Sequence, residues 1–201
     1  MLFRSRFRTL PPPPAIARWR ARHGLGPALI ATVGTIQPRK RVEHVIDAFV
    51  RTGAAARGWQ LVVAGRLRPG YAPAWVSAPP AGVCWLGAID DQSLRALYAA
   101  AEVFVSASEY EGFGLTVAEA MAAGTAVVAV ATSSLPEVVG DAGILVERSD
   151  PALLADALGR ILDDTTLRRT LASQARLRAA VFTWQDAAAR TARVYDEAVR
   201  T

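Results

Sequence analysis

The chain has 201 residues, of which 52% are hydrophobic and 20% charged, the balance of a folded globular protein long enough for one domain with a sizeable core. No apolar run approaches the ~20 residues that span a bilayer, and residues 1–8 lack the apolar core of a secretory signal, so we expect a cytoplasmic protein. Cys84 is the single cysteine, which excludes an intrachain disulfide and a cysteine-based metal cluster.

The formal net charge is +5 and the pI is about 10.1. A basic balance can indicate nucleic acid or an anionic membrane surface as the partner. The arginines are spread along the chain and no nucleic-acid-binding module is recognisable, so we expect no nucleic acid partner. A peripheral contact with an anionic membrane, at its inner face, is the more plausible interpretation of the charge.

The chain begins with a basic, proline-containing stretch that we interpret as a linker remnant over 1–27. The four prolines 11–14 favour an extended polyproline segment. A short basic helix over 15–23 is expected to follow and to end at Gly24. We expect one domain over 28–182 and a C-terminal helix over 183–201.

Six short apolar runs predict buried strands, at 28–33, 59–64, 83–86, 103–105, 126–130 and 143–146. Helical patterns lie between and after these runs. Four have the ranges 41–52, 134–139, 165–180 and 184–200, while one begins at Asp91, one ends before Gly124 and one begins at Pro151. This alternation predicts an α/β fold, a parallel sheet with helices on both faces. Because ligands bind at the carboxyl ends of such strands, the residues that follow them should gather at one edge, among them Gly34, Gly65, Ala88 and Glu111.

Two polar features outside the strand ends have a structural and a chemical interpretation. His44 lies off the apolar stripe of 41–52, and we interpret it as a solvated surface histidine in preference to a catalytic one. Asp90 and Asp91 could suggest a metal site, but short carboxylates before a helical run favour an N-cap. Since His23 and His44 are the only histidines, we expect no metal site.

The most informative stretch is 108–121, SEYEGFGLTVAEAM. An apolar strand precedes two glycines around Phe113, and a helix-forming run follows. The first N–H groups of a helix lack internal partners and carry partial positive charge, so this turn suits phosphate. Gly112 and Gly114 should let a ligand approach the backbone closely.

Two carboxylates bracket this turn, Glu111 at its mouth and Glu119 more than one turn into the helix, with seven residues between them. A carboxylate is an acceptor-only group and therefore suits hydroxyl ligands. Two carboxylates beside a phosphate cradle suit a ligand with phosphate and many hydroxyls, such as a sugar nucleotide. Alone, the pair could also be solvated helix-end carboxylates, and the glycines a plain tight turn.

The stretch resembles the Glu-x7-Glu motif of retaining GT-B glycosyltransferases of family four. The resemblance also includes 33–40 (VGTIQPRK) and 135–143 (LPEVVGDAG), and covers roughly 28–200. It implies a Rossmann-like, sugar-nucleotide-binding domain, the C-terminal half of a GT-B fold. It further implies transfer of a sugar with retention and without a metal or other cofactor, because positive charge and helix amides stabilise the departing diphosphate.

The resemblance assigns a role to each matching residue. Glu111 would contact donor-sugar hydroxyls, the amides of 112–115 the sugar and pyrophosphate, and Glu119 the ribose. Lys40 is the only lysine and matches the phosphate-binding lysine of the family, with help from Arg39. The expected catalytic residues are Glu111 and Lys40. The expected donor-binding residues are Gly34, Thr35, Arg39, Lys40, Glu111, Gly112, Phe113, Gly114, Leu115 and Glu119. We expect Lys40 and Glu119 to line a water-filled crevice.

Two departures from the family pattern bear on function. Thr35 stands where many relatives carry an arginine, and the subset with Gly-Thr before Pro-Arg-Lys resembles mannosyltransferases, which favours GDP-mannose as donor. The N-terminal acceptor domain, which supplies the acceptor pocket and a catalytic histidine, is not in the sequence, so we expect a separate chain to provide it. The alternative is a truncated or split nucleotide-sugar-binding module without transferase activity. A GT-B epimerase is disfavoured because its motifs differ.

Overall fold

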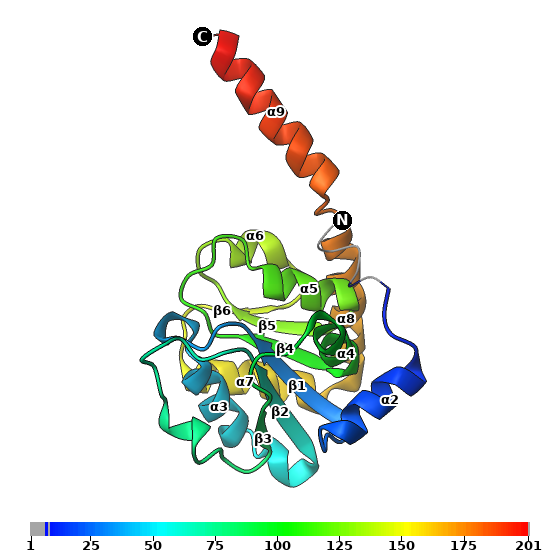
Figure 1. Ribbon diagram of the computed structural model, residues 1–201, viewed down its shortest axis with the longest axis vertical. Helices are drawn as coiled ribbons and strands as arrows, with labels where there is room; N and C mark the ends of the chain where they lie inside the picture. The colour runs from blue at the N-terminus through cyan, green and yellow to red at the C-terminus, as the bar shows by residue number, and fades with distance from the viewer. Residues whose placement is uncertain (1–6, 8, 201) are drawn as a thin grey trace.

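The computed structural model describes residue 7 and residues 9–200 of the chain. Six strands form one parallel sheet, in the order β3-β2-β1-β4-β5-β6 (Figure 1). The strands are β1 (Ala28–Val33), β2 (Trp59–Ala64), β3 (Val83–Trp85), β4 (Val103–Ser106), β5 (Ala126–Val130) and β6 (Ile144–Val146). The predicted α/β class and all six predicted strands are confirmed.

The α-helices follow every strand except β2, after which only a 3-10 turn precedes β3, and one further helix precedes β1. They are α2 (Pro13–Arg22), α3 (Val42–Arg51), α4 (Asp91–Ala100), α5 (Leu115–Ala123), α6 (Leu135–Val139), α7 (Pro151–Asp163), α8 (Thr165–Ala180) and α9 (Trp184–Arg200). Short 3-10 turns occur at Pro38–Lys40, Ala54–Arg57 and Ala74–Val76. The N-cap interpretation of Asp90 is confirmed, because its carboxylate accepts the Ser93 N–H at 2.7 Å.

The strand order reverses between β1 and β4. The chain runs outward from β1 to β2 and β3, then returns to the other side of β1 and continues through β4, β5 and β6. The pairs Ile30↔Val103 and Ala31↔Phe104 join the two halves. Open α/β sheets bind ligands at such a switch point, outside the carboxyl ends of the strands.

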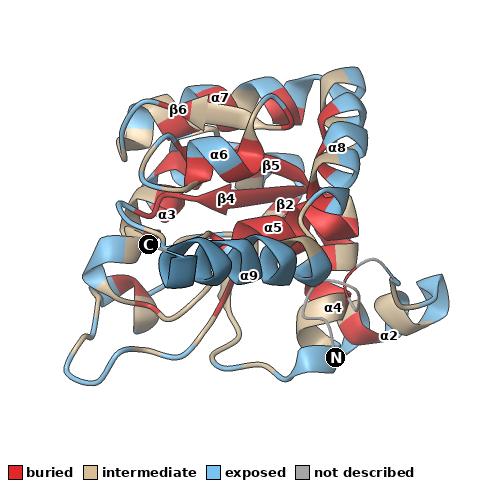
Figure 2. Ribbon diagram, turned by 90° about the horizontal axis from the view of Figure 1, so that it is seen from above, coloured by how far each residue is buried: buried red, intermediate tan, exposed pale blue. Residues whose placement is uncertain are grey.

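The alternation of side chains along each strand divides the core into two layers. One layer contains Leu29, Val62 and Phe104 and is covered by α4 and α5, whereas the other contains Ile30, Leu61 and Val105 and is covered by α3 and α7. Figure 2 shows the strands buried between these helices. Both faces are therefore closed, which leaves the ends of the strands as the place for a polar site.

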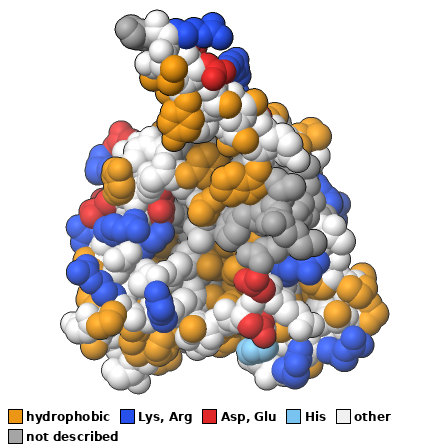
Figure 3. Space-filling model, turned by 45° about the horizontal axis from the view of Figure 1, so that its top comes forward, with side chains coloured by type: hydrophobic (Ala, Val, Ile, Leu, Met, Phe, Trp, Pro, Cys, Tyr) orange, Lys and Arg blue, Asp and Glu red, His pale blue; other side chains and the backbone are white. Residues whose placement is uncertain are grey.

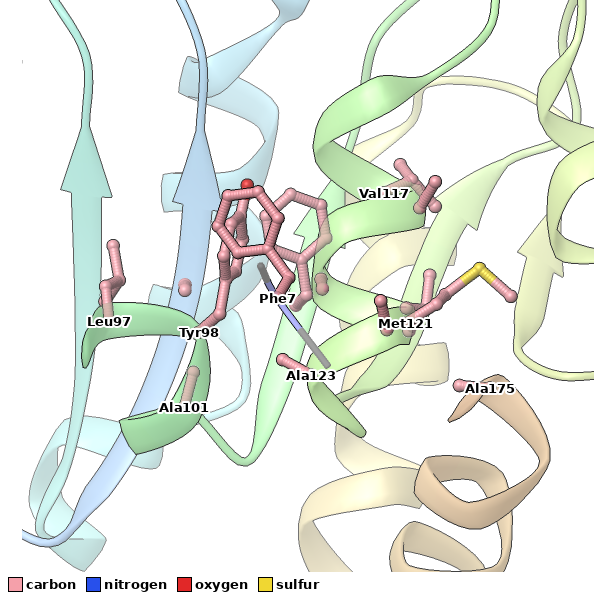
Figure 4. Close-up of a cluster of buried hydrophobic side chains, with 14 of the residues drawn as sticks. Phe7, Leu97, Tyr98, Ala101, Val117, Met121, Ala123 and Ala175 are labelled. Atoms are coloured by element: carbon pink, nitrogen blue, oxygen red, sulfur yellow. The ribbon is translucent and has the colours of Figure 1, made fainter. Parts of the chain in front are cut away.

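The N-terminal segment is more helical than predicted. Pro13 and Pro14 open α2 in place of continuing an extended run, because proline lacks only an N–H that the first turn does not use. Residue Phe7 is buried, and its ring meets that of Tyr98 edge to face at 5.5 Å (Figure 4). Phe7 thus packs on α4, and α2 contacts the same helix.

Helix α9 differs from the other long helices. None of its residues is buried, and it projects away from the domain (Figures 1 and 2). It nevertheless carries exposed apolar side chains at Trp184, Val194, Tyr195 and Val199. Figure 3 shows hydrophobic side chains on the visible surface of α9 and around its base.

Candidate functional site

The candidate site lies where β1 and β4 end, at the switch point of the sheet. Lys40 closes the 3-10 turn after β1, and Glu111 follows β4 at the entry to the turn before α5. The ammonium of Lys40 donates to the carboxylate of Glu111, and both side chains are largely enclosed, with 14% and 11% exposed. Arg39 places a guanidinium nitrogen 3.7 Å from the same carboxylate. Two cations and one anion thus converge at the strand ends.

A second set of contacts joins the two loops that carry these charges. The Glu109 N–H donates to the Arg39 carbonyl at 2.9 Å, and the guanidinium of Arg41 binds the Glu109 carboxylate at 2.7 Å. Arg41 has φ +46°, a left-handed conformation that is unfavourable for a residue with a side chain. The ion pair and the Glu109 N–H bond tie the loop that carries Lys40 to the loop that carries Glu111.

The loop after β5 holds the backbone of Glu111. The Glu111 N–H donates to Ser133 Oγ at 2.9 Å, and Ser134 Oγ donates to the Glu111 carbonyl at 3.0 Å. Ser133 and Arg41 are the two non-glycine residues with positive φ in the described part of the chain, and both touch this site. Sequence reasoning missed these serines, although their place directly after a strand at the same sheet edge was a usable signal.

Position 114 requires glycine for a packing reason that the sequence did not reveal. Its φ is +83°, and a Cβ built there would lie 2.5 Å from Leu135 Cδ2. Packing against α6 therefore requires glycine at this position, directly before α5. The sequence had instead suggested that glycine is there to let a ligand approach closely. Gly112 is different, because a Cβ there would meet nothing within 4 Å, so its surroundings are open.

A second pair of glycines packs two neighbouring turns together at the same edge of the sheet. Gly34, after β1, has φ +145°, and Gly65, after β2, has φ +148°. A Cβ on Gly65 would lie 1.8 Å from the Gly34 carbonyl oxygen. Because no side chain fits in that space, Gly65 lets the turn that carries Gly34 pack directly on the neighbouring turn.

The charged groups and the turn before α5 surround one pocket, with a volume of about 410 Å³. Its lining contains nine of the ten residues predicted to bind a donor, all except Glu119. The lining residues are Gly34, Thr35, Gln37, Arg39, Lys40, Glu111, Gly112, Phe113, Gly114, Leu115 and Thr116. The first turn of α5 faces this space, so the pocket combines a helix N-terminus with two cationic side chains.

Glu119 does not line a water-filled crevice, and that expectation is wrong. Its exposed fraction is 2%, and its carboxylate accepts the Tyr98 hydroxyl at 2.9 Å. Burial and the neighbouring Glu119 raise the pKa of the Tyr98 phenol well above its usual range, so Tyr98 stays a donor. The reason for the burial of Glu119 is that α5 is packed on every side, with each residue of 117–123 buried.

His44 is also less exposed than expected. It is half-buried, and its Nδ1 lies 2.9 Å from the Ser149 carbonyl oxygen and 3.0 Å from Ser149 Oγ. These contacts join α3 to the loop before α7. The interpretation as a solvated surface histidine is therefore wrong, although the contacts are those of a structural residue.

Within residues 7 and 9–200, no group of three or more His, Cys, Asp or Glu side chains is arranged to hold a metal ion. None of the helices in the same residues combines the length and the apolar character that crossing a bilayer requires.

Comparison with known proteins gives a consistent result. The family model described as "Glycosyl transferases group 1" matches residues 15–178. The O-antigen chain mannosyltransferase B of Escherichia coli is 33% identical over 175 residues, which cover 81% of this chain and 44% of that protein. The D-inositol 3-phosphate glycosyltransferase of Salinispora arenicola is 36% identical over 189 residues, which cover 85% of this chain and 41% of that protein.

The fold also matches a solved structure. The C-terminal domain of a group 1 family glycosyl transferase from Francisella tularensis superposes with a TM-score of 0.74 and 27% sequence identity, covering 86% of this chain and 94% of that domain. The chain therefore spans less than half the length of the two curated relatives but almost all of this isolated C-terminal domain.

Proposed function

Because the chain belongs to the family of group 1 glycosyl transferases, we propose that its pocket binds a nucleoside diphosphate sugar and that the chain is the donor half of a retaining glycosyltransferase. The observation that carries this proposal is the pairing of Lys40 with Glu111 beside the first turn of α5. One pocket thereby offers a cation and helix amides for phosphate and a carboxylate for hydroxyl groups.

In this proposal the diphosphate lies between Lys40, Arg39 and the first amides of α5. The ammonium of Lys40 is a compact point charge, and the helix N-terminus adds partial positive charge without an ion. These groups stabilise the charge that develops on the leaving diphosphate. We therefore propose that neither binding nor transfer requires a metal or another cofactor.

The sugar lies toward Glu111, whose carboxylate would accept hydrogen bonds from its hydroxyl groups. For transfer, the bond from the anomeric carbon to the diphosphate oxygen breaks, and the electron pair leaves with the phosphate. The acceptor hydroxyl bonds to the same face of that carbon and gives its proton to the departing phosphate oxygen. Attack on that face explains retention without a nucleophilic side chain.

We propose that Glu119 binds the ribose, provided that its carboxylate becomes accessible. The carboxylate is 2% exposed and bound by Tyr98, so it must become accessible when the nucleotide enters. Because Tyr98 belongs to α4, the proposal requires Tyr98 or α4 to move away from Glu119 when the nucleotide enters.

GDP-mannose is the donor that we favour. The support is Thr35 in the sequence Gly-Thr before Pro-Arg-Lys, together with the description of the Escherichia coli relative as a mannosyltransferase. The name of the Salinispora relative mentions D-inositol 3-phosphate and no donor sugar, so other donor sugars are also to be tested.

The acceptor site is proposed to come from an N-terminal half, since the curated relatives are about twice as long as this chain. Helix α9 is the proposed surface for that half, because its exposed apolar residues have no cover in the described part of the chain. The alternative is a nucleotide-sugar-binding module that transfers nothing on its own. Co-expression with a candidate N-terminal half distinguishes the two, because only the first alternative predicts sugar transfer on addition of that half.

The net charge of +5 supports a peripheral contact with anionic lipid as a further part of this proposal. Sedimentation with vesicles that contain anionic lipid should decrease as salt is added, because the contact is electrostatic. Equal sedimentation with neutral and anionic vesicles would contradict it.

A thermal-shift screen with GDP, UDP, ADP and their sugars tests the proposed function directly. A ligand at 100 times its Kd stabilises the folded state by about 2.7 kcal/mol, which corresponds to a rise in Tm of roughly 5–10 °C for a chain of this size. We expect GDP and GDP-mannose to give the largest shifts. No shift with any nucleoside diphosphate, at millimolar concentration, would overturn the proposal.

A further inference from the structure

The middle of the turn before α5 is held by an aromatic contact from a distant part of the chain. Phe113 lies between the two glycines of this turn, and its ring meets the ring of Phe182 edge to face, at 5.6 Å and 89°. Phe182 belongs to the short turn between α8 and α9. The guanidinium of Arg178 covers the Phe182 ring at 5.2 Å.

The residues on both sides of Phe182 are held in place by hydrogen bonds. Arg178, which covers it, donates from Nη2 to the Glu137 carbonyl at 2.6 Å and from Nε to the Val138 carbonyl at 3.4 Å, so it also ties α8 to α6. On the other side, Thr183 Oγ1 accepts the Asp186 N–H at 3.1 Å and caps the start of α9. Phe182 therefore offers a firm support for whatever packs on it.

The turn before α5 needs such a support at its centre. At one end, Glu111 is held by Ser133 and Ser134, and at the other end Gly114 is held by its packing on Leu135. Between them, a Cβ on Gly112 would meet nothing within 4 Å, so no packing fixes that residue, and glycine has access to more backbone conformations than other residues. The packing of Phe113 therefore helps decide which way the N–H groups of 112–114 point.

Phe113 also separates two pockets. It lines the donor pocket on one side. On the other side it lines a second pocket of about 350 Å³, which is also lined by Phe182, Arg178 and the first turn of α9. Aromatic pairs in this edge-to-face arrangement contribute about 0.5–1.5 kcal/mol beyond their buried area. Phe182 can thus influence the donor pocket without entering it.

We infer that Phe182 is a positioning residue for the donor turn, acting through Phe113. This inference rests on the proposed function for its consequence, which is tighter diphosphate binding. It also gives the junction of α8 and α9 a role in donor binding, because Phe182 moves with that junction.

The test compares Phe182→Ala, the conservative Phe182→Tyr and the milder Phe182→Leu with the wild-type chain. Val181→Ala is the matched control, since Val181 is an exposed apolar residue of the same turn. The first measurement is hydrogen exchange of the amides of 111–116 without ligand, with β1 as internal reference. The second is calorimetry with a nucleoside diphosphate and with the parent nucleoside.

We expect Phe182→Ala to speed exchange of 111–116 while β1 is unchanged, and to weaken the nucleoside diphosphate about 2- to 12-fold, the factor that corresponds to an aromatic pair. Nucleoside affinity should stay the same, and Phe182→Tyr should restore both properties. Phe182→Leu should give a smaller effect in the same direction, which preserves the test if the alanine variant does not fold.

Exchange of 111–116 that is equal in wild type, Phe182→Ala and Phe182→Leu would overturn the inference, even if the nucleotide binds. An equal effect of Val181→Ala would also overturn it. Absence of nucleotide binding by the wild type would refute the proposed function instead, because the exchange comparison needs no ligand.

Discussion

Lys40 and Glu111 are 71 positions apart in the chain and form an ion pair across the switch point of the sheet. In the free protein the cation proposed to bind phosphate is thus neutralised by the carboxylate proposed to bind the sugar. A ligand that carries both groups can replace the pair, taking Lys40 with its phosphate and Glu111 with its hydroxyls. A ligand that carries phosphate alone leaves Glu111 beside a second anion.

The first prediction follows from this pair and concerns Glu111→Gln. Removing the carboxylate frees Lys40 and removes repulsion of the phosphates, so affinity for a nucleoside diphosphate should rise about fivefold, which corresponds to ~1 kcal/mol. Affinity for the nucleotide sugar should fall relative to the diphosphate, because an amide is a weaker acceptor than a carboxylate. Calorimetry with both ligands measures the ratio. If both affinities changed by the same factor, Glu111 would not distinguish sugar from phosphate.

The second prediction concerns Glu119, which is buried with Tyr98 as its donor. Glu119→Ala leaves the buried Tyr98 hydroxyl without this acceptor, which costs about 1–3 kcal/mol of folding free energy and lowers Tm by roughly 2–12 °C. Glu119→Gln keeps an acceptor and should lose less. Thermal unfolding followed by circular dichroism measures both variants. An alanine variant as stable as wild type would mean that this contact does not contribute to the fold.

The fold was largely predictable from the sequence, and the reason is its regular alternation. The runs 28–33, 59–64 and 126–130 have the predicted limits because each is a mainly apolar segment with few polar residues. The burial of Glu119 could also have been predicted, since the helix sequence LTVAEAMAA is apolar on every side and such helices are enclosed.

Other parts of the site could not be predicted, because they depend on which loops the sheet brings together. The pairing of Arg41 with Glu109 and the support of Glu111 by Ser133 join segments far apart in the chain. The place of Ser133 after a strand indicates the sheet edge at which it lies, but no local pattern of residues indicates which partner Ser133 or Arg41 binds. Likewise, only the packing of one turn on another shows why Gly65 must be glycine.

The third prediction concerns Gly65. A Cβ at this position would lie 1.8 Å from the Gly34 carbonyl oxygen, so Gly65→Ala must displace the turn that leads to Lys40. We expect a loss of at least about 3 kcal/mol of folding free energy. Gly70→Ala is the control, because Gly70 also has positive φ but a Cβ there would meet nothing within 4 Å, and it should cost only about 1–2 kcal/mol. Urea unfolding compares them, and equal losses would contradict the packing argument.

The fourth prediction concerns metal removal. If Lys40, Arg39 and the first turn of α5 provide the positive charge for the diphosphate, affinity should be the same in EDTA as with Mg²⁺. Calorimetry in the two buffers measures this. Binding that is lost in EDTA and restored by Mg²⁺ would show that the protein groups are not sufficient.

The most direct test of the donor site is Lys40→Ala, measured by calorimetry with a nucleoside diphosphate and with the parent nucleoside. Hydrogen bonds to charged groups contribute about 1.5–3 kcal/mol, so the nucleoside diphosphate should bind roughly 10- to 150-fold more weakly. The nucleoside, which has no phosphate, should bind as it does to wild type. Equal loss of affinity for the two ligands would show that Lys40 does not bind phosphate and would contradict the assignment of this pocket as the donor site.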